Sequence, residues 1–266
     1  MKIALVIAAY NEAENIGPLT QRLIRTLDSL EGGSWNLIYV IEGTDGTVDI
    51  AREFAVTRPE LEIQYNESPS GLGNAFRRGF NAVPSDADFI VTMDADQNHQ
   101  PEEIPRLLGI AREKEVDIVV GSRRVNDSEV EGMPLWKSAI SGLVNRVMRV
   151  MMGVQIEDMT SGFRIYRADV LREIRFDNVG FAFLPEILIN AAAQGYKIVE
   201  EPIRFTFREA GQSKMRIAAT GLSYIKLFAK HSVASIFSAR SHVASSALAV
   251  ASERPDDTDR RDAPKS

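Results

Sequence analysis

The chain has 266 residues, of which 44% are hydrophobic and 26% are charged, and this composition predicts a globular protein built on one large domain. The absence of cysteine excludes disulfides, thiolate metal sites and cysteine nucleophiles, and it favours a reducing compartment such as the cytosol. The net charge of −6 gives no electrostatic reason to expect nucleic-acid binding. The sequence contains no run of about eighteen uncharged apolar residues, so no membrane-spanning helix is predicted.

The first half of the chain alternates strand and helix patterns, which predicts a mainly parallel sheet with helices on both faces. The predicted strands are residues 3–9, 36–41, 61–65, 88–93 and 116–121. After the first strand, Asn11 followed by Glu14 resembles a capping box, and apolar residues then recur at helical spacing from Ile16 to Leu30. Another helix is predicted over residues 101–115, with its prolines in the first turn.

The regular alternation stops after residue 120. The pattern then predicts a polar loop over residues 122–134, helices over 135–152 and 181–194, and a strand over 197–207. Residues 217–243 carry an uneven apolar stripe interspersed with lysine and arginine, which predicts an amphipathic helical appendage. We therefore expect a main domain over 1–215, an appendage over 216–243 and a disordered tail over 244–266.

Two carboxylates follow the fourth predicted strand directly. In an extended backbone residues i and i+2 share a face, so Asp94 and Asp96 can point the same way at the carboxyl end of that strand. Mg²⁺ or Mn²⁺ prefers oxygen ligands and commonly takes one or two carboxylates, which leaves positions for substrate phosphates. A bare Asp-x-Asp is also common in acidic turns. For the nearby His99 we expect a place behind the metal ligands or a role in packing the loop, in preference to metal ligation, because a hard cation prefers oxygen to imidazole.

Other polar loops follow the first three strands. The aromatic and carboxylate side chains of Tyr10-Asn11-Glu12 can stack on a base and accept hydrogen bonds from its edge, or the segment can simply cap a helix. Glu42 can bind a ribose or a base, or it can belong to a turn. The glycines of 70–74 can let backbone amides approach a phosphate. Because the carboxyl ends of parallel strands meet at one edge of a sheet, we expect a nucleotide crevice there.

In this order the motifs resemble those of glycosyltransferase family 2, and within it those of the dolichyl-phosphate mannose synthases. They are Ala-Ala-Tyr10-Asn11-Glu12, Thr44-Asp-Gly-Thr47, Gly71-Leu-Gly73, Met93-Asp-Ala-Asp96, Gly121-Ser-Arg123 and Thr160-Ser-Gly-Phe-Arg164. The match extends to about Met215. The resemblance implies an α/β fold of the GT-A type, a Rossmann-like, mainly parallel sheet with helices on both faces.

The resemblance also assigns candidate site residues. Around the nucleotide sugar it places Ala8, Tyr10, Glu12, Ile41, Glu42, Asp94, Ala95 and Asp96, together with the basic residues Arg123, Arg208 and Lys214. The metal candidates are Asp96 and Asn98, with Asp94 beside them. The acceptor phosphate would meet Arg123, Lys137 and Ser141. Glu186 falls where the family carries a glutamate of unclear role.

The sequence departs from the family pattern at four of these places. The loop after the second strand contains Glu42-Gly43 and is shorter than the usual Asp-Asp-x-Ser form, which leaves guanine and uracil both open. Ala8 replaces a common proline, Lys137 a common arginine, and Asn98 a glutamine or serine.

The acceptor decides whether a general base is needed. A phosphate monoester has a second pKa of about 6 and is largely ionised near neutrality, so it needs positioning among cations and no dedicated base. A hydroxyl acceptor needs a base, for which Asp158 is the candidate; its alternative role is to fix a turn by accepting backbone amides. The catalytic candidates are therefore Asp96, Arg123 and Asp158.

We predict a metal-dependent glycosyltransferase that transfers a hexose to a polyprenyl or dolichyl phosphate with inversion. The predicted donor is GDP-mannose, and the predicted location is the cytoplasmic face of a membrane. The appendage would lie on the membrane or bind a partner, such as an integral membrane subunit. One alternative is a UDP-sugar-dependent enzyme with a lipid phosphate or hydroxyl acceptor. A second is a silent nucleotide-sugar-binding module that recruits a membrane partner, although the retention of Asp94, Asp96 and Arg123 argues against it.

Overall fold

The structure is a computed structural model, and it describes residues 1–207, Tyr224 and Leu227. On the helix Leu135–Met152 the backbone is described throughout, but the side chains of Lys137, Met151 and Met152 are not. Of the predicted appendage the structure describes Tyr224 and Leu227; the rest of the appendage, the tail, Arg208 and Lys214 lie outside the described residues.

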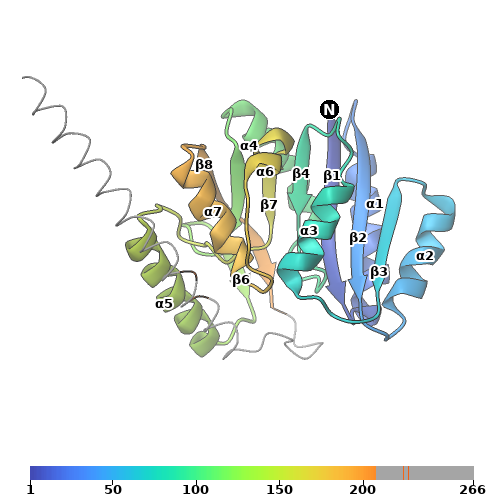
Figure 1. Ribbon diagram of the computed structural model, residues 1–266, viewed down its shortest axis with the longest axis horizontal. Helices are drawn as coiled ribbons and strands as arrows, with labels where there is room; N and C mark the ends of the chain where they lie inside the picture. Colours follow the sequence, from blue (N-terminus) through green and yellow to red (C-terminus); the bar gives the residue numbers. More distant parts are fainter. Residues whose placement is uncertain (208–223, 225–226, 228–266) are drawn as a thin grey trace, which may run out of the picture.

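A seven-stranded sheet forms the centre of the domain (Figure 1). Its strands are β1 (Lys2–Tyr10), β2 (Ser34–Glu42), β3 (Leu61–Asn66), β4 (Phe89–Thr92), β5 (Ile118–Ser122), β7 (Arg164–Arg167) and β8 (Ile198–Pro202). They lie in the order β3-β2-β1-β4-β7-β5-β8, all parallel except β7, which lies antiparallel between β4 and β5. A second sheet pairs β6 (Glu129–Glu131) with β9 (Arg204–Thr206) in parallel.

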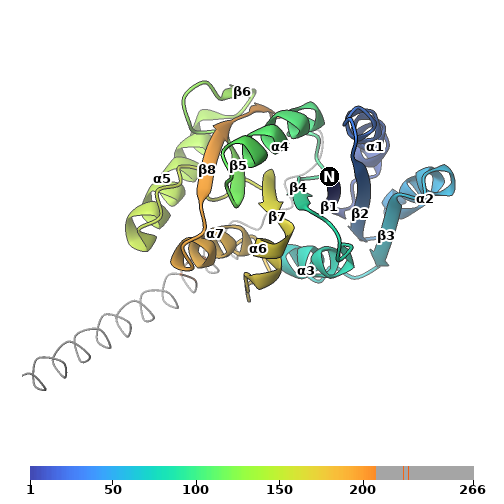
Figure 2. The ribbon, with the colours of Figure 1, turned by 90° about the horizontal axis from the view of Figure 1, so that it is seen from above.

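Helices cover both faces of the large sheet, as the view from above shows (Figure 2). One layer holds α1 (Ala13–Asp28), α2 (Thr47–Thr57) and α4 (Ile104–Glu113), the last preceded by the 3-10 turn η1 (Pro101–Glu103). The other layer holds α3 (Leu72–Ala82), α6 (Ala168–Glu173) and α7 (Phe183–Ala193). In both views α5 (Leu135–Met152) lies at the end of the sheet that contains β5 and β8.

The central strands are apolar because they are buried on both faces. In β1, Leu5 belongs to the core under α1 and α4, whereas the next residue, Val6, belongs to the core that contains Phe76 of α3. This alternation confirms the predicted α/β fold, a mainly parallel sheet with helices on both faces.

Three local predictions were wrong. The capping box does not form, because Asn11 has φ of 52° and its side chain accepts the amide of Thr44, whereas Asp45 from the neighbouring loop accepts the amide of Ala13 at the start of α1. The strand predicted over 197–207 is divided into β8 and β9. The strands β6 and β7 were not predicted.

Among the described residues, no helix has the length and apolar character that spanning a bilayer requires.

The topology places one crevice. From β1 the strand order runs outward to β2 and β3 on one side, and to β4 on the other. Ligands of open α/β sheets bind at the carboxyl ends of the strands where the order reverses in this way. The loops that follow Tyr10 and Thr92 meet at this point.

Candidate active site

The two carboxylates of the Asp-x-Asp motif lie just beyond the carboxyl end of β4. The backbone around them is fixed by the turn that precedes β7, since the Thr92 hydroxyl donates to the carbonyl of Gly162 at 2.8 Å. A Cβ atom on Gly162 would lie 2.6 Å from Oδ1 of Asp94, so only glycine leaves room for that carboxylate. The Asp94 side chain remains 38% exposed, which leaves it open to a ligand.

Asp96 is tied to Asn98 within the same loop. Its two oxygens accept the backbone amide of Asn98 at 3.0 Å and the side-chain amide at 2.6 Å. Burial, followed by the charge of Asp94, raises the pKa of Asp96 to about 6, and burial also raises the pKa of Asp94. The effect of the Asp94 charge on the pKa of Asp96 agrees with the sequence prediction that both carboxylates lie at one end of the strand.

The side chains in this loop fit a hard divalent cation by their chemistry. Asp94, Asp96 and Asn98 offer carboxylate and amide oxygens, and such a cation needs only one or two protein carboxylates when substrate phosphates supply the rest. Among the described residues no group of three His, Asp or Glu side chains surrounds a common point, so a cage built from the protein alone is not present there. The metal assignment stays a prediction.

His99 is fully buried beside these carboxylates. Its ring packs against Phe163 and Phe205, with ring centres 5.4 and 5.3 Å away, and burial lowers its pKa to about 4. Its Nδ1 lies 3.6 Å from Asp94, and within the described part of the chain neither ring nitrogen has a hydrogen-bond partner. This placement is the one expected for a packing role.

The loops after β1 and β2 hold each other in place. The amide of Glu12 donates to the hydroxyl of Thr47 at 2.8 Å, and Gly43 has φ of 102°, which favours glycine. A Cβ atom on Gly43 would lie 2.0 Å from the Asn11 side-chain oxygen. These contacts fix the wall on which Tyr10, 40% exposed, is presented at the crevice.

Three predicted nucleotide contacts are buried in the structure. Glu42 is 4% exposed, and its carboxylate already accepts the amide and hydroxyl of Ser70 and a guanidinium nitrogen of Arg78 at 2.8 Å. Ile41 and Ala95 have buried side chains within the core beneath α1 and α4, so only their backbone can meet a ligand. Ala8 is half-buried against the opposite core.

The glycines after β3 make room for protein backbone. The amide of Gly73 donates to the carbonyl of Val179 at 2.8 Å, and a Cβ on Gly73 would lie 2.1 Å from the carbonyl oxygen of Asn178. The expected phosphate contact at these glycines is therefore wrong. Glu186 is fully buried and accepts the backbone amides of Asp177 and Asn178. It thereby holds residues 177–179, the segment that lies against Gly73, in place.

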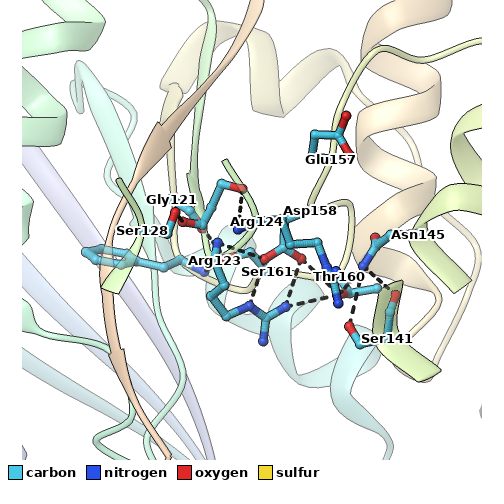
Figure 3. A network of polar contacts seen from close by, with 12 residues as sticks. Gly121, Arg123, Arg124, Ser128, Ser141, Asn145, Glu157, Asp158, Thr160 and Ser161 are labelled. Atoms are coloured by element: carbon cyan, nitrogen blue, oxygen red, sulfur yellow. Dashed lines mark hydrogen bonds and ion pairs between the residues drawn. The ribbon is translucent and has the colours of Figure 1, made fainter. Parts of the chain in front are cut away.

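Arg123 and Asp158 form a buried ion pair at the end of β5 (Figure 3). The guanidinium donates from Nε to Oδ2 at 2.7 Å and from Nη2 to Oδ1 at 2.8 Å, and the backbone amide of Arg123 donates to Oδ2 at 3.1 Å. Burial alone would raise the pKa of Asp158, but the Arg123 guanidinium outweighs it and holds that pKa far below its usual range. Asp158 is therefore poorly suited to act as a general base, and its turn-fixing role is the one that the geometry favours.

The segment that carries Asp158 is held from two sides. Glu200 of β8 accepts the amides of Glu157 and Asp158 at 2.6 and 2.8 Å, and Asn145 of α5 accepts the amide of Met159 at 2.9 Å. Arg164, fully buried, donates to the carbonyls of Ser161, Leu184 and Met159. No sequence pattern indicated Glu200, whereas Asn145 was visible as a polar residue between the apolar Val144 and Met148.

The acceptor-side candidates come together only in part. Arg123, through Thr160 and Asn145, is linked to Ser141 on α5 (Figure 3). Lys137 lies one helical turn before Ser141, and its side chain is outside the described residues. Arg124, the next residue after Arg123, donates to the carbonyl of Ser138 on α5 at 3.0 Å.

Comparison with known proteins places the chain among sugar-transferring enzymes. A model of the family described as glycosyl transferase family 2 matches residues 4–175. The chain is 36% identical over 233 residues to an undecaprenyl-phosphate mannosyltransferase of Micrococcus luteus, covering 85% of this chain and 93% of the relative. It is 35% identical to a polyprenol monophosphomannose synthase of Mycolicibacterium smegmatis, covering 79% and 80%, and 33% identical to a dolichol-phosphate mannosyltransferase of Pyrococcus furiosus, covering 81% and 60%.

Solved structures share the fold. Glucosyl-3-phosphoglycerate synthase of Mycobacterium tuberculosis, in complex with Mn²⁺, UDP-glucose and phosphoglyceric acid, superposes with a TM-score of 0.62 at 20% identity, covering 84% of this chain and 76% of that one. S. aureus TarS in complex with UDP-GlcNAc gives 0.56 at 18% identity, covering 82% and 62%. At these identities the likeness establishes the GT-A fold alone.

Proposed function

Because this chain belongs to glycosyl transferase family 2, we propose that it transfers mannose from GDP-mannose to a polyprenyl phosphate. The support for sugar and acceptor is that three relatives, 33–36% identical, are named as mannosyltransferases or mannose synthases of undecaprenyl, polyprenol or dolichol phosphates. Guanine as the base and inversion at the sugar carbon rest on the resemblance of the motifs.

The observation that carries the proposal is the pairing of Arg123 with Asp158. Asp158 occupies the Nε and Nη2 side of the guanidinium, and within the described residues Nη1 makes no hydrogen bond to the protein (Figure 3). A guanidinium held along one side can offer its remaining donors to a phosphate. Since a phosphate acceptor is already ionised, it needs this cation and no base, whereas a hydroxyl acceptor would need the carboxylate that Arg123 already holds.

The donor would lie between the loops after β1 and β4. Tyr10 and Glu12 stand on the nucleotide side of this crevice, and Asp94 and Asp96 stand on the diphosphate side. A divalent cation held by Asp96 and Asn98 would neutralise the charge that develops on the departing diphosphate. The support for metal dependence is the set of oxygen donors, which suits Mg²⁺ or Mn²⁺.

The outer face of α5 suggests how the enzyme reaches a lipid acceptor. Ile140, Leu143, Val147 and Val150 recur at helical spacing and are 51%, 65%, 38% and 74% exposed. Ser141, a candidate for the acceptor phosphate, lies on the same helix. A helix with an apolar outer face and arginines beside it fits the interface of a lipid bilayer, where the polyprenyl tail resides. The enzyme would thus work at a membrane surface, and the absence of cysteine favours the cytoplasmic face.

One assay tests the proposal. The purified full chain, mixed with polyprenyl phosphate in detergent, is offered radiolabelled GDP-mannose, GDP-glucose, UDP-glucose or UDP-N-acetylglucosamine, with Mn²⁺ or with chelator. We expect label in the organic phase only from GDP-mannose with Mn²⁺. Label from UDP-sugars alone would overturn the donor, full transfer in chelator would overturn the metal, and no transfer from any donor would favour the silent binding module.

A further inference from the structure

Helix α5 is held to the domain by few side chains. Of the α5 side chains that the structure describes, Asn145 and Met148 are buried, at 3% and 0% exposure, while the outer face is open to solvent. Because α5 buries so little apolar surface, packing contributes little to fixing its position. Its specific polar contacts therefore decide where the helix lies.

The contacts of Asn145 join α5 to the segment that carries Asp158. Its side-chain oxygen accepts the amide of Met159 at 2.9 Å, and its nitrogen lies 3.3 Å from the hydroxyl of Thr160. The same nitrogen donates to the carbonyl of Ser141, one turn earlier on the helix, at 3.0 Å. The buried amide thus links the acceptor-side residue Ser141 to residues 159 and 160.

Thr160 extends this link to the ion pair. Its hydroxyl donates to Oδ1 of Asp158 at 3.0 Å and accepts Nη2 of Arg123 at 3.1 Å (Figure 3). A hydroxyl has one proton to donate and two lone pairs to accept with, and the contacts to Asp158, Arg123 and Asn145 use all three. The hydroxyl therefore has one preferred orientation, which couples the position of Asn145 to that of the guanidinium.

The segment 157–160 also has contacts with β8 and a second contact with α5. The two amides bonded to Glu200 fix it to β8, and Arg149 of α5 forms an ion pair with Glu157 one helical turn after Asn145. Movement of α5 relative to the sheet must therefore strain the contacts of Asn145, together with the Arg149–Glu157 ion pair and the bond from Arg124 to the Ser138 carbonyl.

We propose that Asn145 is a positioning residue which, through the hydroxyl of Thr160, fixes α5 in register with Arg123, so that Ser141 and Arg123 reach the acceptor phosphate at one point. This inference rests on the proposed function, and it adds that acceptor recognition depends on a side chain that does not touch the acceptor. The donor candidates at the ends of β1 and β4 make none of these contacts, and Arg123, which the resemblance also places beside the nucleotide sugar, is the one described donor candidate that they reach.

The test compares Asn145→Ala, Thr160→Val, Thr160→Ser and the double variant Asn145→Ala/Thr160→Val with the native full chain. The matched control is Asn190→Ala on α7, away from the site. It removes a hydrogen bond that the side-chain amide of Asn190 donates to the carbonyl of Arg175. For each protein, kcat/KM for polyprenyl phosphate is measured at saturating donor, GDP affinity is measured by calorimetry, and Tm reports folding.

Misplacement of a positioned group by about 1 Å costs on the order of 100-fold, so we expect Asn145→Ala and Thr160→Val each to lower acceptor kcat/KM by about 10- to 100-fold. Thr160→Ser keeps the hydroxyl and should restore most of this activity. The double variant should be little worse than the poorer single variant, because both remove one link. GDP affinity should fall much less than acceptor kcat/KM in these variants, and it should stay unchanged in Asn190→Ala.

Three results would overturn the inference while leaving the proposed function intact: native acceptor kinetics in Asn145→Ala, multiplied losses in the double variant, or a parallel loss of GDP affinity in Asn145→Ala, which would indicate a general structural defect. If the native chain transfers to no polyprenyl phosphate, the proposed function fails and the inference fails with it.

Discussion

Replacement of Asp158 by Asn removes the charged partner of a buried guanidinium. In the native chain the carboxylate receives two guanidinium bonds of 2.7 and 2.8 Å and one backbone bond of 3.1 Å, and its side chain is fully buried. Removing one partner of a buried ion pair costs about 3–5 kcal/mol, because the other charge is left uncompensated. For a domain of this size a loss of about 3 kcal/mol lowers Tm by about 6–12 °C.

Thermal unfolding followed by circular dichroism between pH 7 and pH 3 measures this effect. The pKa of Asp158 is depressed in the folded chain, so its contribution is complete above the unfolded pKa near 3.8 and is lost as pH falls further towards the folded pKa. The asparagine introduced by Asp158→Asn does not titrate, so the gap in Tm between the two proteins should be widest near neutrality and should narrow below about pH 4. A control variant, Asp49→Asn, breaks an exposed pair with Arg52 and should change Tm little.

Activity then separates a positioning role from a base. If Asp158 acts through Arg123, adding Asp158→Asn to an Arg123→Gln variant should cost little further activity, because their effects are not independent. If Asp158 were the base, the two losses would multiply. An unchanged Tm at pH 7, or multiplied losses in the double variant, would refute the positioning role.

Three further predictions concern other parts of the site. Asp96→Ala should abolish the gain in donor affinity that Mn²⁺ provides in calorimetry, and undiminished metal-supported affinity would contradict the metal assignment. Gly162→Ala should displace Asp94, whose oxygen lies 2.6 Å from the new Cβ, and weaken donor binding about tenfold or more with little change in Tm. The control Gly109→Ala has no atom nearer than 4.0 Å; it should leave donor binding unchanged and raise Tm slightly, because alanine is favoured over glycine inside helix α4. Leu143→Glu on α5 should reduce flotation of the protein with vesicles that contain anionic lipid, whereas Val56→Glu, at a position likewise exposed to water on α2, should not; equal flotation of both variants and the native chain would remove α5 as the membrane face.

The parallel strands were predictable because burial on both faces makes them continuous apolar runs, as in β1 and β2. Strand β7 was missed because its sequence, Arg164-Ile-Tyr-Arg167, begins with an arginine, which a sequence pattern places at the surface. In the structure that arginine is fully buried, and three backbone carbonyls accept its bonds. No local pattern encodes partners that the fold supplies from distant segments.

The candidate site likewise contains some features that a local sequence pattern predicts and others that only the fold reveals. The end of β4 could be expected to present Asp94 and Asp96 together, because strand geometry alone sets their spacing. The pairing of Arg123 with Asp158 joins residues 35 positions apart, so the sequence left Asp158 open as a base or as a turn residue. Gly71 and Gly73 likewise indicated a close approach, but only the fold could tell that Asn178 and Val179 approach them in place of a phosphate.

The choice of acceptor is the most direct test of the role proposed for Arg123 and Asp158. The full chain is given radiolabelled GDP-mannose and Mn²⁺ with either a polyprenyl phosphate or the corresponding free polyprenol, and lipid-extractable label is counted. If Arg123 receives an ionised nucleophile while Asp158 stays bound to it, label should enter the lipid only when the phosphate is present. Comparable labelling of the free alcohol would contradict this chemistry, because the hydroxyl would then be deprotonated by a base that the account does not contain.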